Sequence, residues 1–327
     1  MSRIGIIGSG SWGCALGIYL AKNGNEVKIW SFDEEECRLI NEERICKFLS
    51  DVTIPDGVVC STDYKTVVED VDLILHVTPS KFFRNILNGY KQYVSNQPIV
   101  ICSKGFESDS LKTLDEVLVE EIPNARFGVL SGPSHAEEVS VDMPTALVVA
   151  SEDDELCELV TDIFKSDTMR MYKSKDVRGV ELGGALKNII AFCAGALNGI
   201  GLGDNSYAAL VTRGLVEISR IGVALGGQKD TFYGLTGLGD LIVTCGSLHS
   251  RNRKAGMLIG QGYSIEETRE KVGMTIESID NIEVAYKLSK KFNVDVPIIN
   301  AVYDVIFNKL DPKEAVLLLM RRDLKSE

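Results

Sequence analysis

The feature that most constrains this chain is a glycine-rich segment near its N-terminus, GSGSWG at residues 8–13. The segment fits the pattern GxGxxG, directly follows an apolar run at residues 3–7 and opens a helix-like stretch at 12–22. A strand, a glycine turn and a helix in this order begin a βαβ unit that binds a dinucleotide. Gly8 is expected to allow the tight turn, Gly10 to let the backbone approach a pyrophosphate, and Gly13 to let helix and strand pack closely. The alternative is a glycine turn with only a structural role.

Short apolar runs alternate with helix-like segments through the first half of the chain. Strands are predicted at residues 3–7, 26–30, 72–77, 98–102, 126–130, 145–150 and 169–172. Helices are predicted at residues 12–22, 34–43, 82–93, 110–122 and 154–165. Continuous apolar strands separated by helices are typical of a parallel sheet covered on both faces. The pattern predicts an α/β Rossmann-type domain with a mostly parallel sheet at residues 1–176.

The pattern changes after Lys175, where strand-like runs largely stop. Long helical segments are predicted at residues 177–197, 206–225, 265–272, 279–291 and 296–307, and a final short helix at 313–320. A chain of 327 residues is long enough for two domains. We therefore expect an all-α C-terminal domain at residues 177–327 that carries substrate and catalytic groups, joined to the first domain by a helix.

Composition excludes several classes of partner. The formal net charge of −12 disfavours binding to nucleic acid or to an anionic membrane surface. The eight cysteines form no CxxC pair and mostly lie in apolar segments, which predicts buried thiols in a reducing compartment. With three histidines and no zinc-like spacing, no metal site is expected. No apolar run approaches the ~20 residues of a membrane span, and no secretion signal is apparent, so we expect a cytoplasmic protein without integral membrane association.

An acidic residue follows the second predicted strand at the position that discriminates between NAD and NADP. Asp33 lies about 20 residues beyond Gly13, where a carboxylate suits the ribose 2′-hydroxyl of NAD and repels the 2′-phosphate of NADP. A helix N-cap is an equally good interpretation of Asp33. The absence of Lys and Arg between Ser31 and Cys37 does not depend on that choice, so NAD is the expected coenzyme.

Two further strand ends carry unusual residues. Ligands of open parallel sheets bind beyond the carboxyl ends of the strands. Lys104 stands there between Ser103 and Gly105, and the loop at 131–136 combines Gly, Pro and Ser in a turn whose N–H groups could hold an anion. A surface lysine is the alternative for Lys104. His135 is expected to begin a helix rather than to act as a base.

A second lysine lies in an apolar, glycine-rich helix. Lys187 follows Gly183 and Gly184, and two more glycines, Gly195 and Gly199, come later in the same helix. Because each helical glycine costs about 1 kcal/mol relative to alanine, these glycines indicate close approach of another backbone or a ligand. A lysine on such a face loses hydration, which favours its neutral form and suits it to general-base work. The alternative is a lysine whose amine reaches water.

Two polar segments in the second half complete the set of candidates. Asp240 follows the glycine turns at 234–239 and supplies an acid. The segment at 247–253 brings together Ser250, Arg251 and Asn252, which are suited to bind a phosphate group. The alternative for this segment is a polar helix start with an exposed arginine.

Eight segments, in order, resemble the NAD(P)-dependent glycerol-3-phosphate dehydrogenase family. The segments are GSGSWG at 8–13, SKG at 103–105, SGPSHAEEV at 131–139, GGALKNI at 183–189, GDN at 203–205, GLTGLGDL at 234–241, TC at 244–245 and HSRNR at 249–253. The resemblance runs nearly from end to end of the chain. It implies an oxidoreductase that interconverts sn-glycerol 3-phosphate and dihydroxyacetone phosphate with NAD(P)H for glycerophospholipid synthesis.

The resemblance also implies residue roles. Lys187 is similar to the family's proton acceptor, and Lys104 and Asp240 to its other catalytic groups. The implied substrate contacts are Lys104, Gly132, Ser134, Lys187, Asp240, Ser250, Arg251 and Asn252. The implied cofactor contacts, with the glycine segment and Asp33 included, are Gly8, Gly10, Ser11, Trp12, Gly13, Asp33, Lys104, Ala136, Arg251, Thr275 and Glu277.

One departure from the family pattern bears on the coenzyme. Many bacterial members carry a basic residue after the second strand, whereas this chain has Trp30-Ser31-Phe32-Asp33, closer to the eukaryotic NAD-linked form. We further expect a homodimer. Two other hypotheses remain: a related two-domain dehydrogenase for a 3-hydroxy acid, against which the cationic Arg251 and Arg253 argue, and a non-catalytic dinucleotide sensor, against which the joint presence of Lys187, Lys104 and Asp240 argues.

Overall fold

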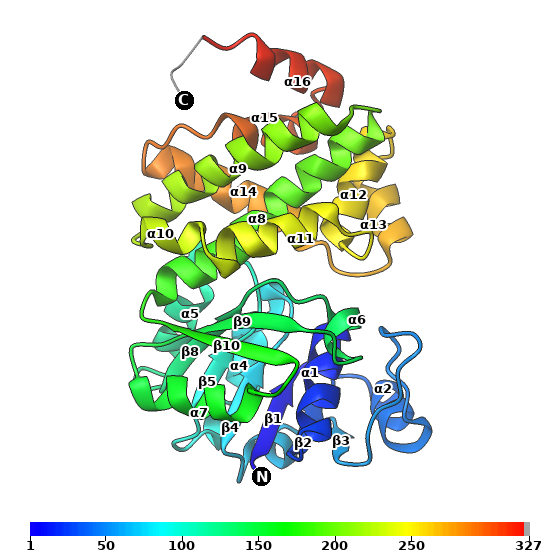
Figure 1. Cartoon of the computed structure of the whole chain (residues 1–327), viewed down its shortest axis with the longest axis vertical. Coiled ribbons are helices and arrows are strands. Elements are labelled where there is room, and N and C mark those ends of the chain that lie inside the picture. The colour runs from blue at the N-terminus through cyan, green and yellow to red at the C-terminus, as the bar shows by residue number, and fades with distance from the viewer. Residues whose placement is uncertain (324–327) are drawn as a thin grey trace. The chain divides into compact units, whose positions relative to one another are not determined.

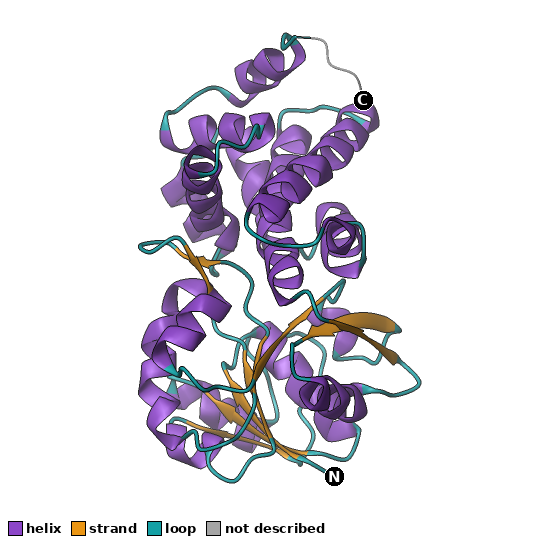
Figure 2. Ribbon diagram, turned by 90° about the vertical axis from the view of Figure 1, so that its left-hand side faces the viewer, coloured by secondary structure: helices purple, strands orange, loops and turns teal. Residues whose placement is uncertain are grey.

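The chain divides into two units near residue 181. A computed structural model describes residues 1–323. The first unit comprises Met1–Glu107 and Lys112–Glu181, and the second comprises Ser108–Leu111 and the chain from Leu182 onward. Every strand of the described chain lies in the first unit, and the second unit is helical (Figures 1 and 2). The predicted fold class, a Rossmann-like domain followed by an all-α domain, is confirmed.

The first unit is built on an eight-stranded sheet with the order β10-β9-β8-β5-β4-β1-β2-β3. The strands are β1 (Arg3–Ile7), β2 (Glu26–Trp30), β3 (Val58–Ser61), β4 (Leu73–His76), β5 (Ile99–Ile101), β8 (Phe127–Ser131), β9 (Thr145–Ala150) and β10 (Met169–Ser174). All neighbours pair in parallel except β8 and β9, which are antiparallel. The chain runs from β1 through β2 to β3 in one direction along the sheet, and then crosses back to β4, which lies on the other side of β1. This reversal is the point where open α/β sheets bind ligands.

Helices cover both faces of this sheet (Figure 1). They are α1 (Ser11–Lys22), α2 (Glu34–Arg38), η1 (Leu39–Glu43), α3 (Tyr64–Val68), η2 (Ser80–Phe82), α4 (Phe83–Tyr90), η3 (Lys91–Tyr93), α5 (Leu114–Glu121), α6 (Ala136–Val139) and α7 (Asp154–Phe164). The apolar strand residues, including Ile4, Ile6 and Leu75, are fully buried between the helical layers. This burial is why the strands carry continuous apolar runs rather than alternating ones.

Two segments of the first unit differ from the prediction. The strand β3 was not predicted. The predicted helix at 110–122 was wrong in its first turn, because the chain there forms the hairpin β6 (Phe106–Glu107) and β7 (Lys112–Thr113), with Leu111 at a φ of 59°. The helix begins only at Leu114, where Thr113 and Glu116 form a capping box.

The first helix of the second unit is α8 (Val177–Gly199), which begins in the first unit and continues into the second. The others are α9 (Asp204–Ala224), α10 (Lys229–Phe232), η4 (Leu235–Gly239), α11 (Asp240–Gly246), α12 (Arg251–Gly260), α13 (Ile265–Val272), α14 (Glu277–Lys291), α15 (Pro297–Phe307) and α16 (Pro312–Met320). Among residues 1–323, only α8 has the length and apolarity of a membrane span, and 89% of its most apolar window is buried.

Close backbone packing explains the glycines of α8. A Cβ on Gly195 would lie 1.9 Å from the carbonyl oxygen of Arg253, and one on Gly199 would lie 2.3 Å from that of Met257. On the facing helix α12, a Cβ on Gly256 would lie 1.8 Å from the carbonyl oxygen of Phe192. The predicted close approach is therefore confirmed, and the approaching group is the backbone of α12.

Candidate active site

The glycine segment forms the turn between β1 and α1. Gly8 has a φ of 125°, a conformation that favours glycine, and a Cβ on Gly13 would lie 1.9 Å from the carbonyl oxygen of Gly8. For Gly10, by contrast, no heavy atom of residues 1–323 beyond its neighbours in the chain lies within 4 Å of the position a Cβ would take. Gly8 and Gly13 thus close the turn, and Gly10 leaves an open backbone surface that suits a pyrophosphate.

The start of α1 suits an anion for a second reason. Gly10 is the N-cap, and in the described chain no side chain caps this helix and no acidic residue occupies its first turn. Ser11 and Trp12, both partly buried, stand in that turn. The backbone N–H groups of a helix start and the helix dipole both favour phosphate oxygens. The residues present therefore fit the pyrophosphate of a dinucleotide.

Asp33 serves as a helix cap in the structure. Its Oδ1 accepts a hydrogen bond of 2.9 Å from the backbone N–H of Glu35 at the start of α2. The alternative interpretation of Asp33 as an N-cap is therefore confirmed. Capping does not remove the negative charge, so a role of Asp33 toward the ribose stays a prediction.

Loops after β5 and β8 bring three predicted residues together. The two strands pair in parallel, so their carboxyl ends lie side by side. Lys104 Nζ lies 3.5 Å from the carbonyl oxygen of Gly132, and the hydroxyl of Ser134 donates to the same oxygen at 3.1 Å. Gly132 has a φ of 140°, and Ala136 begins the short helix α6. Lys104 is partly buried, which argues against a freely solvated surface lysine.

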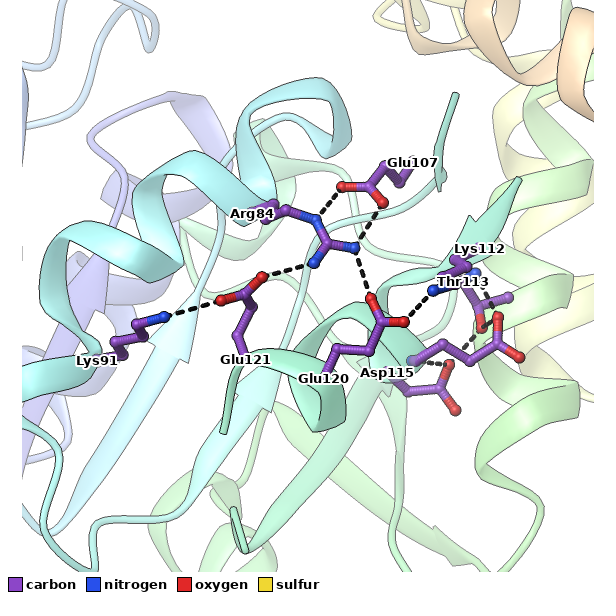
Figure 3. Close-up of polar contacts among 9 residues, drawn as sticks. Arg84, Lys91, Glu107, Lys112, Thr113, Asp115, Glu120 and Glu121 are labelled. Atoms are coloured by element: carbon purple, nitrogen blue, oxygen red, sulfur yellow. Dashed lines mark hydrogen bonds and ion pairs between the residues drawn. The ribbon is translucent and has the colours of Figure 1, made fainter. Parts of the chain in front are cut away.

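A network of charged side chains anchors the hairpin that follows Lys104 (Figure 3). Arg84 of α4 binds both carboxylate oxygens of Glu107, at 2.6 and 2.7 Å. The same guanidinium binds Glu120 at 2.8 Å and Glu121 at 2.6 Å, both on α5. Lys91 also binds Glu121, and the hydrogen bonds from Lys91 and then Arg84 lower the pKa of that carboxyl group. Arg84 thereby ties α4, α5 and the hairpin strand β6 into one structure.

Lys187 lies in a buried polar triad of the second unit. Its Nζ donates to Asp240 Oδ1 at 2.7 Å and to Thr244 Oγ1 at 2.5 Å, and the Thr244 hydroxyl lies 3.2 Å from Asp240 Oδ1. The Lys187 side chain is 7% exposed and that of Asp240 is 3% exposed. The alternative of an amine that reaches water is therefore wrong. The carboxylate stabilises the ammonium and so offsets the desolvation that was expected to favour the neutral amine.

Gly183 explains how this triad is assembled. A Cβ on Gly183 would lie 2.9 Å from the carbonyl oxygen of Thr236, in the turn η4 that leads into α11. Asp240 is the first residue of α11, and Thr244 stands one turn later, so both side chains project from one face of that helix. Cys245 follows Thr244, and burial raises the pKa of its thiol to about 12, which keeps it protonated and unreactive. All eight cysteines are buried and free, as predicted.

The remaining predicted residues gather at the starts of α12 and α14. Ser250 is the N-cap of α12 and accepts from the backbone N–H of Arg253 at 3.2 Å. Arg251, the first residue of that helix, is exposed. Asn252 Oδ1 accepts from the backbone N–H of Ser278 at 3.1 Å, which ties α12 to α14.

Glu277, the first residue of α14, connects this group to the triad. Its Oε2 lies 3.5 Å from Nδ2 of Asn188, the neighbour of Lys187 in α8. Thr275 lies two residues before it and is partly buried. The predicted residues of the second unit therefore form one continuous group, from Lys187 through Glu277 to Asn252. Those of the first unit line the carboxyl edge of its sheet.

Sequence reasoning assigned no role to Thr244, Asn188 or Arg84. Thr244 could have been found, because it stands four residues after Asp240 and a helix places such residues on the same face. Asn188 and Arg84 act through tertiary contacts for which the sequence carries no periodic signal. No group of three or more His, Cys, Asp or Glu side chains within residues 1–323 is placed to hold a metal ion.

A dinucleotide-binding sheet followed by a helical unit with a buried lysine–aspartate pair defines a two-domain nicotinamide-dependent dehydrogenase. Residues 3–157 match the N-terminus of the NAD-dependent glycerol-3-phosphate dehydrogenase family, and residues 176–317 match its C-terminus. The chain belongs to this family.

Relatives and solved structures agree with this assignment. A glycerol-3-phosphate dehydrogenase [NAD(P)+] of Fusobacterium nucleatum is 46% identical over 332 residues, which cover 100% of this chain and 99% of the relative. The crystal structure of glycerol-3-phosphate dehydrogenase from Coxiella burnetii is 34% identical with a TM-score of 0.95, and the match covers 98% of this chain and 99% of the other. The yeast Saccharomyces cerevisiae enzyme is 27% identical with a TM-score of 0.83, over 97% of this chain and 99% of that one.

Proposed function

We propose that this chain interconverts sn-glycerol 3-phosphate and dihydroxyacetone phosphate with NAD(P)H and so supplies glycerol phosphate for glycerophospholipid synthesis. The observation that carries the proposal is the buried amine of Lys187, held by Asp240 and Thr244 within a family of glycerol-3-phosphate dehydrogenases. The bound coenzyme supplies or accepts a hydride at C2 of the substrate. Residues of the chain transfer the proton and bind and orient the substrate.

In the direction of reduction, the ammonium of Lys187 gives its proton to the forming alkoxide at C2. In the direction of oxidation, the neutral amine of Lys187 accepts the proton of the C2 hydroxyl. Asp240 fixes the amine through a 2.7 Å hydrogen bond and balances its charge. Lys104 positions the substrate or stabilises charge on its oxygen, with Gly132 and Ser134 beside it. Ser250, Arg251 and Asn252 bind the phosphate group, and this remote binding orients the reacting end of the substrate.

Coenzyme contacts follow the same proposal. Gly8, Gly10, Ser11, Trp12 and Gly13 hold the pyrophosphate, while Asp33, Lys104, Ala136, Arg251, Thr275 and Glu277 complete the coenzyme site. NADH is the preferred coenzyme, because Asp33 and Glu36 are acidic and no Lys or Arg lies between Ser31 and Cys37. In this proposal the coenzyme-binding domain comprises residues 1–176 and the substrate domain comprises residues 177–327. The protein is a homodimer. It works in the cytoplasm.

The direct test is oxidation of NADH and NADPH with dihydroxyacetone phosphate, measured side by side. Lys187→Ala should abolish turnover while the protein still binds NADH, and near-normal turnover would rule out the assigned role. Phosphate-free 3-hydroxy acids turned over efficiently would support the rival dehydrogenase. A protein that binds NADH but oxidises none with dihydroxyacetone phosphate would instead be a sensor. Size-exclusion chromatography with light scattering tests the dimer.

A further inference from the structure

A buried carboxylate lies directly beside the glycine turn. Glu36, in the first turn of α2, is 5% exposed. Its Oε2 accepts hydrogen bonds from the hydroxyls of Ser9, at 2.5 Å, and Ser31, at 2.8 Å. The two serine oxygens also lie 2.8 Å apart. Within residues 1–323, the side-chain donors to this carboxylate are hydroxyls and not cations.

The two serines place this carboxylate at a defined position in the fold. Ser9 lies between Gly8 and Gly10, and Ser31 directly follows β2. Because β1 and β2 pair in parallel, both serines stand at the same carboxyl edge of the sheet. In this fold the adenosine ribose of a dinucleotide lies at that edge, and an acidic group there receives its 2′-hydroxyl.

Glu36 is better suited than Asp33 to repel a 2′-phosphate electrostatically. The Asp33 carboxylate belongs to a partly exposed residue and accepts the backbone N–H of Glu35 in its own helix, so water and salt screen its charge. The Glu36 carboxylate is enclosed by protein, where a charge acts over the same distance through a lower effective dielectric constant. Its hydrogen bonds tie it to the two residues that frame the ribose position.

We propose that Glu36 determines the coenzyme specificity of this chain: its buried charge excludes the 2′-phosphate of NADPH, and its hydrogen bonds fix Ser9 and Ser31 at the ribose. This inference rests on the proposed binding of a dinucleotide at the glycine turn. It replaces Asp33 with Glu36 as the residue that distinguishes NADH from NADPH.

The test measures coenzyme affinity and needs no turnover. Dissociation constants for NADH and NADPH are determined by fluorescence titration and calorimetry for the wild type and for Glu36→Gln. Glutamine keeps the size and an acceptor oxygen while removing the charge, so NADPH should bind about tenfold or more tightly, with NADH changed by less than about threefold. The matched control is Glu34→Gln, which removes one charge from the exposed side of the same helix and should change neither constant by more than about twofold.

A second variant keeps the test decisive if Glu36→Gln does not fold. Ser31→Ala leaves the charge but removes one hydroxyl, so it should weaken both coenzymes by about three- to tenfold and leave their ratio unchanged. Improved NADPH binding in Asp33→Asn but not in Glu36→Gln, or a changed ratio in Ser31→Ala, would overturn the inference. Equal binding of NADH and NADPH by the wild type would also overturn the inference about Glu36, and the assignment as a dehydrogenase would remain. A wild type that binds neither coenzyme would reject the proposed function itself.

Discussion

Glu217 should make the second unit less stable as the pH rises. This residue of α9 is 2% exposed, and both of its oxygens accept the backbone N–H of Ile298, at 2.8 and 3.0 Å, while Oε2 also accepts that of Ile299. Glu217 thereby caps α15, whose own N-cap, Val296, has no side chain that can do so. Burial raises the pKa of Glu217 to about 7, although the two N–H groups lower it in part.

The size and sign of the effect follow from that pKa. Below pH 4.5 the carboxyl group is protonated in the folded and unfolded states alike and its ionisation costs nothing. Between pH 4.5 and 7 the unfolded chain loses the proton while the folded chain keeps it, so stability falls. A difference of about 2.5 pKa units, at about 1.4 kcal/mol each, gives a loss of about 3 kcal/mol, complete above pH 7.

Glu217→Gln removes this dependence. The stability of the variant relative to the wild type should be about 2.5 kcal/mol higher at pH 8 than at pH 5, because a small part of the loss has already occurred at pH 5. Any constant cost of burying the amide cancels in that difference. Urea unfolding followed by far-UV circular dichroism measures it at both pH values, and the fluorescence of Trp12 and Trp30 reports the first unit in parallel.

The exposed Glu270 of α13 provides the control, because Glu270→Gln makes the same change in water and should act equally at both pH values. An effect of Glu217→Gln that is the same at pH 5 and pH 8, or larger at pH 5, would refute the reasoning. It would mean that Glu217 ionises alike in the folded and unfolded chain.

Three other changes have expected outcomes. Thr244→Val removes a hydrogen bond to a charged amine, so kcat/KM for dihydroxyacetone phosphate should fall about ten- to hundredfold with NADH affinity unchanged; an unaltered value would exclude a role for the hydroxyl. Arg84→Met removes the cation shared by the carboxylates of Glu107, Glu120 and Glu121, so the KM for dihydroxyacetone phosphate should rise and the Tm should fall. Unchanged values of KM and Tm would show that this network does not position the Lys104 loop. Gly195→Ala forces a Cβ against the Arg253 carbonyl and should cost about 1–3 kcal/mol in urea unfolding, and full stability would show that α8 and α12 separate freely.

The parts of the fold that the sequence predicts are those with a local signal. The strands at 3–7, 26–30 and 145–150 match β1, β2 and β9 residue for residue, because each is a short stretch rich in Val, Ile and other apolar residues, with polar residues, glycine or proline at its ends. The strand β3 was missed because its residue Val59 is exposed and the run is only four residues long. The hairpin β6–β7 was missed because its pairing depends on a left-handed Leu111 and on the contact of Glu107 with Arg84, neither of which appears as periodicity.

The residues of the candidate site also divide into those with a local signal in the sequence and those without one. The glycine turn, Lys104 and Lys187 could be predicted because each breaks a local preference: glycine in a helix start, or a cation in an apolar setting. The partners could not be predicted from such rules. Ser250 and Asn252 were expected to face a phosphate, yet their oxygens accept backbone N–H groups of α12 and α14. These contacts do not exclude substrate binding, because the hydroxyl proton and the amide N–H groups remain donors.

The glycines of α8 and the chemistry of Lys187 are consequences of one packing arrangement. A buried ammonium is stable only if an anion and further hydrogen bonds replace its lost water. Those partners come from α11, and α11 reaches Lys187 because the turn before it lies against Gly183, where any Cβ would press on the Thr236 carbonyl. Alanine there would favour the isolated helix by about 1 kcal/mol but push Asp240 away from an amine that has little access to water. The helix therefore carries residues that weaken it locally, because they allow the neighbouring backbone to come close enough to keep a charged amine inside the protein.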